Sequence, residues 1–153
     1  MAFLQMPGNF KPKFIDRLAK FLEQWPNEIP LALEVCHAEW YNSEAFNEFH
    51  EILRKNKITH IITDIAGRRD ILHMRLSTET AFIRFNGANH DSNFTRLDGW
   101  LDCIESYHRQ GLKNIYFFVH QNLEKASPLL SVHFIKNFNA RFETDLSIPK
   151  TPY

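Results

Sequence analysis

Acidic, basic and imidazole side chains follow several apolar segments of this chain, at the point where each segment ends. Those that we expect to line a common site are Glu34, His37, Asp64, Arg68, Arg84, Asn86, His120 and Asn122. Carboxylates and imidazoles can move protons, and guanidinium groups hold anionic oxygens in a forked geometry. The set therefore suits hydrolysis or isomerisation of a phosphorylated, phosphodiester or sugar-like substrate.

The predicted roles follow from side-chain chemistry. Four residues are assigned to catalysis as acids, bases or proton shuttles, namely Glu34, His37, Asp64 and His120. Five are assigned to substrate binding, namely Arg68, Arg84, Asn86, Asn122 and Trp40. Each of these residues could instead be purely structural. Polar residues follow strands in every globular protein because loops are solvated, and Trp40 could pack over the rim of the site.

Glu34 and Arg84 are the most informative of these residues, because each interrupts an otherwise apolar segment. A charge inside such a segment is costly unless it is paired. We therefore expect the two side chains to face the same polar interior, as an ion pair or as part of a site.

The sequence predicts neither a metal nor a cofactor. Carboxylate and imidazole ligands suit zinc or manganese, but the chain has no HExxH motif and no close His-x-His pair. It also lacks the GxGxxG and GxxxxGK[ST] patterns of phosphate-binding loops. Cys36 and His37 are adjacent on an expected strand and would point to opposite faces, which argues against a Cys–His nucleophile.

The elements that must position these residues alternate between strands and helices. Strands are predicted at residues 2–6, 31–35, 59–64, 81–85 and 114–119. Helices are predicted at 12–25, from Asn42 or Ser43, from a Thr95–Asp98 capping box to Gly111, and from Ser127-Pro128. This alternation predicts an α/β protein with parallel (β/α) units, either an open doubly wound sheet or a barrel. In both, chemistry collects at the carboxyl ends of the strands.

Length and composition limit the number of domains and the kinds of partner. The 153 residues suit one domain, expected over 1–146 with a coil tail at 147–153. Lys plus Arg and Asp plus Glu balance at 18 each, so no overall charge attracts nucleic acid or an anionic membrane. The apolar runs are too short to span a bilayer, and the first residues lack the features of a signal peptide. We therefore expect a cytoplasmic protein.

Four segments together resemble the YecE-like family, whose bacterial-type members carry a domain of unknown function. They are LEVCHAEWYNSEAF, TDIAGRRD, AFIRFNGANH and NIYFFVHQN. The resemblance runs from about AFLQMP to Phe138 and implies a TIM-type barrel. At the family's motif positions stand Glu34, His37, Trp40, Asp64, Arg84 and Gly87. Cys36 replaces the family's usual Arg, and His120 and Gln121 replace a frequent pair of asparagines.

The resemblance also implies a partial TIM barrel, equivalent to strands four to eight, because three strand–helix units of the family precede the segment that AFLQMP resembles. Five parallel strands cannot close a normal barrel, since strand number, tilt and shear are linked. The chain could pair with a second copy as a homo-oligomer or with a separate amino-terminal half, rearrange to an open sheet, or be a fragment.

The sequence therefore leaves three functions open. The first is an enzyme that acts on a small-molecule or phosphate-containing ligand. The second is a non-catalytic module that binds a metabolite or a nucleic-acid segment, of which nucleic acid is not favoured. The third is an inactive barrel fragment that needs a partner.

Overall fold

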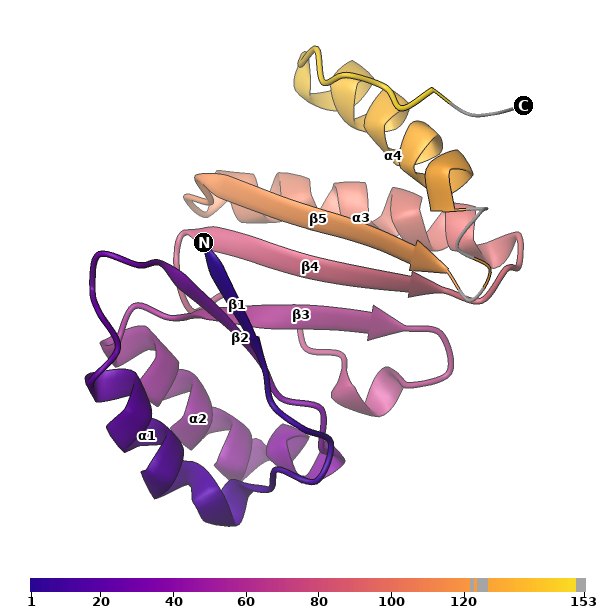
Figure 1. Cartoon of the computed structure of the whole chain (residues 1–153). Helices are drawn as coiled ribbons and strands as arrows, with labels where there is room; N and C mark the ends of the chain where they lie inside the picture. The colour runs from indigo at the N-terminus through magenta and orange to yellow at the C-terminus, as the bar shows by residue number, and fades with distance from the viewer. Residues whose placement is uncertain (122, 124–126, 151–153) are drawn as a thin grey trace. The chain divides into compact units, whose positions relative to one another are not determined.

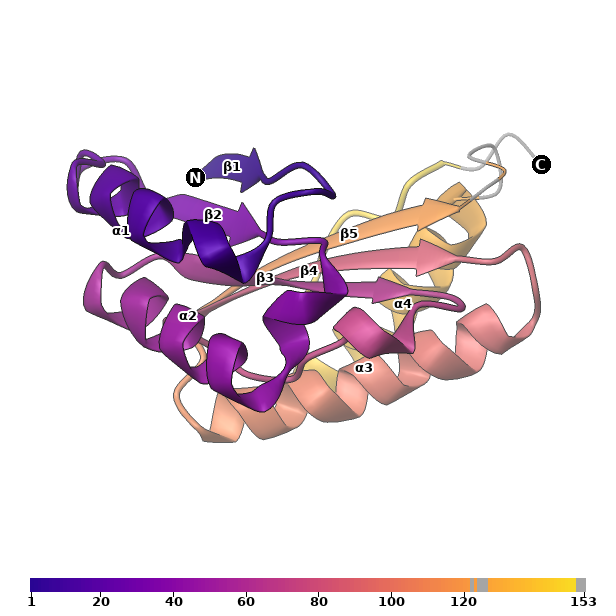
Figure 2. The ribbon, with the colours of Figure 1, turned by 90° about the horizontal axis from the view of Figure 1, so that it is seen from below.

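A computed structural model describes residues 1–121, 123 and 127–150, and it contains a five-stranded sheet with the strands in chain order (Figure 1). The strands are β1 (Ala2–Gln5), β2 (Leu31–Glu34), β3 (Thr59–Ile65), β4 (Thr80–Gly87) and β5 (Asn114–Gln121). β1 pairs with β2 in parallel, as β2 does with β3. All five arrows point the same way in Figure 2. The predicted α/β class with parallel strands is confirmed, and the numbering as barrel strands four to eight stays a prediction.

In the described residues, four α-helices connect or follow the strands: α1 (Ile15–Glu23), α2 (Ser43–Lys55), α3 (Ser92–Arg109) and α4 (Ser127–Phe142). The α2 cap is as predicted, because Asn42 Oδ1 accepts a hydrogen bond from the Ala45 amide at 2.9 Å. The Thr95–Asp98 capping box is wrong. The helix begins at Ser92, whose amide donates to His90 Nδ1 at 3.1 Å, so an imidazole takes the place of the usual cap.

The chain divides into two compact units. Unit 1 comprises Met1–Arg84 and Lys113–Phe117, and unit 2 comprises Phe85–Leu112 and Phe118–Tyr153. β4 and β5 begin in unit 1 and end in unit 2. The expected single domain over residues 1–146, with a tail at 147–153, stays a prediction.

The core of unit 1 lies on the face of the sheet that α1 and α2 cover (Figure 2). Leu18 and Leu22, one turn apart on α1, pack with Leu33 of β2 and with Phe49 and Leu53 of α2. This spacing puts the apolar side chains of each helix on one stripe, which is what the amphipathic pattern predicted. Burying such side chains contributes about 1.5–3 kcal/mol each relative to leaving them exposed.

The opposite face of the sheet in unit 1 carries a row of aromatic rings. Phe82 of β4 stacks on Phe3 of β1 and on Tyr116 of β5, with ring centroids 5.8 Å apart in both pairs. Beneath the row, Ala32 and Ile61 are buried with Phe82. Phe3 is nevertheless 48% exposed and Tyr116 40%. We call Phe3, Phe82 and Tyr116 the aromatic row.

Unit 2 is held together by α3 and α4, whose side chains pair along their length. Asp98 accepts from His133 Nε2 at 2.7 Å, and Arg141 forms ion pairs with Asp102 and Glu105 at 2.6 and 3.0 Å. The buried hydrophobic side chains described in these helices are Leu97, Trp100, Leu101, Ile104, Tyr107, Leu130 and Phe134. No described helix has the length and apolarity that crossing a membrane requires.

Three histidines are buried together on the helix-covered face of β3. The rings of His60 and His73 stack with centroids 3.8 Å apart, and His50 of α2 lies beside them. Burial lowers the pKa of His60 well below its usual range and that of His73 to about 4. Within the described part of the chain, neither ring nitrogen of His60 has a hydrogen-bond partner. The stack is therefore built from neutral rings, with the Arg75 guanidinium close by as a further reason to stay neutral.

Stability should fall as the pH is lowered from about 7 to about 5. His73 takes up its proton at a pKa of about 4 when folded and near 6.5 when unfolded, so between these values the unfolded chain binds more protons. The free energy of unfolding should then decrease by roughly 2 kcal/mol for this residue alone by pH 5. Urea unfolding across the pH range measures the loss.

The control is a pair of histidine variants. His73→Phe keeps a flat ring in the stack and removes the titrating group, although it also removes the 3.0 Å contact with the Ile61 carbonyl. Its stability should be lower at pH 7 but much less dependent on pH, whereas His108→Gln on the exposed surface of α3 should keep the wild-type dependence. Equal pH dependence in the wild type and His73→Phe would contradict this account.

Candidate functional site

A buried carboxylate lies at the carboxyl end of β2 in unit 1. Thr63 Oγ1 of β3 donates to Glu34 Oε1 at 2.6 Å, and Arg84 Nη1 of β4 donates to Glu34 Oε2. The Glu34 side chain is 2% exposed and that of Arg84 is 21% exposed. The prediction that Glu34 and Arg84 face the same interior is confirmed, and Thr63, between them, is a partner that the sequence analysis missed.

This ion pair adjoins the aromatic row. The Arg84 guanidinium lies over the ring of Phe3, 5.3 Å from the ring centroid, in cation–π geometry. Alternation along a strand places every second side chain on one face, which brings Glu34, Thr63 and Arg84 to the same face as Phe3 and Phe82. Unit 1 therefore presents a charged, hydrogen-bonding group beside exposed aromatic faces.

Asp64 lies apart from this group, because it follows Thr63 directly and so points to the other face of β3. Its buried carboxylate pairs with Arg69 Nη1 at 2.5 Å, and the Arg69 side chain is 60% exposed. Strand alternation thus separates Asp64 from Glu34 and Arg84, and the catalytic role assigned to Asp64 stays a prediction. Arg68 also has an acidic partner, since it binds both oxygens of Asp70 at 2.9 Å.

The loop after β2 uses its polar groups for its own structure. His37 Nδ1 accepts from the Glu39 amide at 3.2 Å, so the neutral ring carries its proton on Nε2. Burial raises the pKa of the Cys36 thiol, and Cys36 Sγ accepts from Gln5 Nε2 at 3.6 Å. Cys36 thus remains a thiol, which is the form that does not act as a nucleophile.

Trp40 does not line the site, which corrects the substrate-binding role assigned to it. The ring is fully buried, 4.9 Å from Phe49 and 5.8 Å from Phe10, and its Nε1 donates to the Phe10 carbonyl at 2.7 Å. The short 3₁₀ turn at Ala38–Tyr41 turns the indole into the core. A ligand therefore finds no open face on this ring.

Unit 2 has a polar network of its own, at the carboxyl ends of β4 and β5. Gln121 Oε1 accepts from Asn93 Nδ2 at 3.1 Å and from the Asn89 amide at 3.0 Å, and Asn93 Oδ1 accepts from the Ala88 amide. Both Asn93 and Gln121 are buried. A β-carbon on Gly87 would lie 2.9 Å from Asn93 Nδ2, so the network needs a glycine there.

The remaining predicted site residues also belong to unit 2. The Asn86 carbonyl accepts from Arg96, and His120 is half-buried near the end of β5. Asn122 lies outside the described residues. The roles assigned to Asn86, Asn122 and His120 stay predictions. Among the described residues, no three His, Cys, Asp or Glu side chains are arranged to hold a metal ion.

Comparisons with known proteins identify relatives of this chain. The profile of the family described as "Protein of unknown function DUF72" matches residues 1–152, and the YecE-like proteins belong to that family. The match extends over almost the whole chain, so the restriction of the resemblance to the carboxyl-terminal part of the family is not supported. A search of curated proteins found no match.

Two solved structures share the fold. A DUF72 family protein from Enterococcus faecalis is 17% identical, with a TM-score of 0.75 over 91% of this chain and 61% of its own. Another, from Thermotoga maritima, is 23% identical, with a TM-score of 0.67 over 92% of this chain and 57% of its own. The chain thus spans about three fifths of these relatives.

Removing Arg84 should destabilise the protein strongly, because it leaves the Glu34 carboxylate buried without its counter-charge. We expect Arg84→Met to lower the free energy of unfolding by about 2–4 kcal/mol, and Glu34→Gln with Arg84→Met to recover much of that loss. Arg109→Met, which breaks an exposed pair with Glu105, should change stability by less than about 1 kcal/mol. Similar urea midpoints for Arg84→Met and Arg109→Met would refute the importance of the buried pair.

Gly87→Ala should destabilise unit 2 by roughly 1–3 kcal/mol, because the new methyl group displaces the Asn93 amide from Gln121. Gly99→Ala is the matched control. Gly99 lies inside α3 with open space around it, so alanine there should stabilise the helix by about 0.5–1 kcal/mol. Thermal unfolding distinguishes the two, and a shift in the same direction for both would contradict the role of the network.

Proposed function

We propose that unit 1 of this chain, which belongs to the DUF72 family of proteins of unknown function, binds a sugar-like or phosphorylated small molecule. The binding surface is formed by the aromatic row and by Arg84, which the buried Glu34 and Thr63 hold in place. Because the chain spans about three fifths of its solved relatives, the proposal concerns unit 1 alone.

The observation that carries the proposal is the position of the Arg84 guanidinium. Glu34 engages one of its nitrogens and Phe3 lies beneath it, yet a fifth of the side chain remains exposed. A guanidinium offers five N–H donors in one plane, so donors remain for a ligand. Glu34 holds these donors in a fixed orientation, which lowers the entropy lost when a ligand binds.

The chemistry of the surface suits a sugar-like ligand. Exposed aromatic faces bind the apolar face of a ring, while the remaining N–H donors of the Arg84 guanidinium match the oxygens of hydroxyl groups. A phosphate group on the ligand would add a forked contact with arginine. A nucleic-acid ligand is less well supported, because lysine and arginine are only as numerous as aspartate and glutamate in the chain.

Catalysis, as a hydrolase or isomerase, is the second candidate function. It is favoured by His37, which keeps its proton on Nε2 just beyond the strand that carries Glu34. Against it stand the ion pairs, because Glu34, Asp64 and Asp70 are each held by an arginine. Oxygens that are bound by an arginine are not available to take a proton from a substrate, which favours binding over acid–base chemistry.

The exposed face of unit 1 also bears on the partners of the protein. We infer a cytoplasmic protein in which a second copy, or a separate polypeptide corresponding to an amino-terminal barrel half, borders the exposed face of unit 1. An inactive fragment remains the alternative. Analytical ultracentrifugation of the chain, with and without ligand, distinguishes a monomer that binds from one that first has to assemble.

The binding test is a titration of the ¹⁵N-labelled chain with glucose, glucose 6-phosphate and ribose 5-phosphate. We expect saturable shifts at the amides of Phe3, Thr63 and Arg84 with at least one of them. Tyr116→Ala should weaken that binding at least fivefold, because it removes an exposed ring from the aromatic row. Phe21→Ala removes an equally exposed ring from α1 and should leave the affinity unchanged.

Equal weakening by Tyr116→Ala and Phe21→Ala would overturn the proposed surface. The same ligands serve to separate binding from catalysis, because turnover shows as new product signals in the spectra. Turnover that is lost in His37→Asn while the fold is kept would favour the enzyme. Saturable binding with no product would favour the module.

A further inference from the structure

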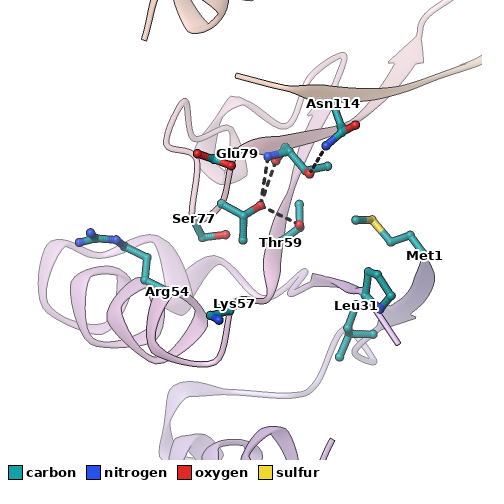
Figure 3. A pocket seen from close by; sticks show the side chains of 11 residues that line it. Met1, Leu31, Arg54, Lys57, Thr59, Ser77, Glu79 and Asn114 are labelled. Carbon is teal, nitrogen blue, oxygen red and sulfur yellow. Dashed lines mark hydrogen bonds between the residues drawn. The ribbon is translucent and has the colours of Figure 1, made fainter. Parts of the chain in front are cut away.

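We propose that unit 1 carries a second binding site, for a small anion of the phosphate-ester class, at the amino ends of its strands. A cavity of about 350 Å³ opens there, at the opposite end of the sheet from Glu34 and Arg84. Its lining includes the first residues of β2, β3, β4 and β5, the loop before β4 and the carboxyl end of α2 (Figure 3). A volume of this size accommodates a small metabolite.

One wall of the cavity is a chain of hydrogen-bonded polar groups, drawn with dashed lines in Figure 3. Thr59 Oγ1 and Thr78 Oγ1 are 2.9 Å apart, Thr78 Oγ1 accepts from the Thr80 amide, and Asn114 Nδ2 donates to Thr80 Oγ1. When Thr59 donates to Thr78, the Thr78 hydroxyl proton has only a 3.4 Å contact with the Thr80 carbonyl. The wall can therefore donate to a ligand oxygen.

The carboxyl end of α2 adds positive charge to the cavity through Arg54 and Lys57 (Figure 3). Arg54 pairs with Glu51 on the surface at 3.2 Å. Within the described ranges, no carboxylate lies within 4.0 Å of the Lys57 ammonium. Glu79 also lines the cavity, but Lys113 pairs with its carboxylate at 2.8 Å. The lining thus offers a cation without a counter-ion to an anionic ligand.

The backbone at Lys57 fixes where this cation lies. The Lys57 amide donates to the Arg54 carbonyl and the Ile58 amide to the Leu53 carbonyl, which is a Schellman motif at the end of α2. Lys57 has a φ of 56°, in the left-handed region that glycine or asparagine adopts at lower cost. A cation also suits any helix carboxyl end. The wall of hydroxyl groups distinguishes the carboxyl end of α2 from other helix ends, because an anion needs hydrogen-bond donors as well as a positive charge.

The test is a titration of the ¹⁵N-labelled chain with inorganic phosphate, at constant ionic strength set with sodium chloride. We expect saturable shifts at the amides of Thr59, Thr78 and Thr80. Lys57→Gln should weaken this binding at least fivefold. Lys55→Gln makes the same charge change two residues away, at a side chain that does not line the cavity, and should stay within twofold of the wild type.

Thr78→Val tests the hydroxyl wall without changing any charge, and it should also weaken binding at least fivefold. If Lys57→Gln does not fold, Thr78→Val alone tests whether the cavity binds phosphate. Absence of saturable shifts at the three amides, or equal weakening by Lys55→Gln and Lys57→Gln, would overturn the site. Glu34→Gln should leave these amide titrations unchanged, so the result is independent of the function proposed for the other end of the strands.

Discussion

A carboxylate buried within a parallel sheet needs a counter-charge beside it. This requirement determines how side chains are arranged at the carboxyl ends of the strands in unit 1. Glu34 reaches across β3 to Arg84, and Thr63 completes its hydrogen bonding. A slip of one residue in the pairing of these strands would turn one of the partners to the opposite face and leave a charge unmatched. The pair therefore helps to fix strand register as well as the charge beside the aromatic row.

The two faces of the sheet in unit 1 differ in how they tolerate polar groups. On the helix-covered face, His60 and His73 are accommodated as neutral, stacked rings, and Asp64 is screened by Arg69 from the loop. On the other face, charge is kept beside exposed aromatic rings. Adjacent residues of one strand, such as Thr63 and Asp64, therefore serve different purposes.

Much of the fold could be predicted from the sequence, because strand and helix periodicity is a local property. The pairing of Glu34 with Arg84 was also accessible, since a charge inside an apolar strand needs a partner. Three features were not. The contact of Thr63 with Glu34 follows from strand register, which the sequence does not show. The burial of Trp40 follows from a short 3₁₀ turn that has no sequence signal. The start of α3 depends on a histidine cap that simple capping rules omit. Neighbouring residues of a strand point to opposite faces. Once Thr63 was known to face Glu34, this rule could have placed Asp64 on the other face.

The sequential order of the strands has a consequence for how the protein is held together. Among the described strands, each hydrogen-bonds to the strands before and after it in the chain, so the cohesion of the sheet resembles that of a linear repeat array. Each pairing closes one crossover connection between consecutive strands, because parallel neighbours cannot be joined by a tight hairpin. β1 and β5 each have one neighbouring strand in this order, so local opening of the sheet costs least at these two edges and most at β3.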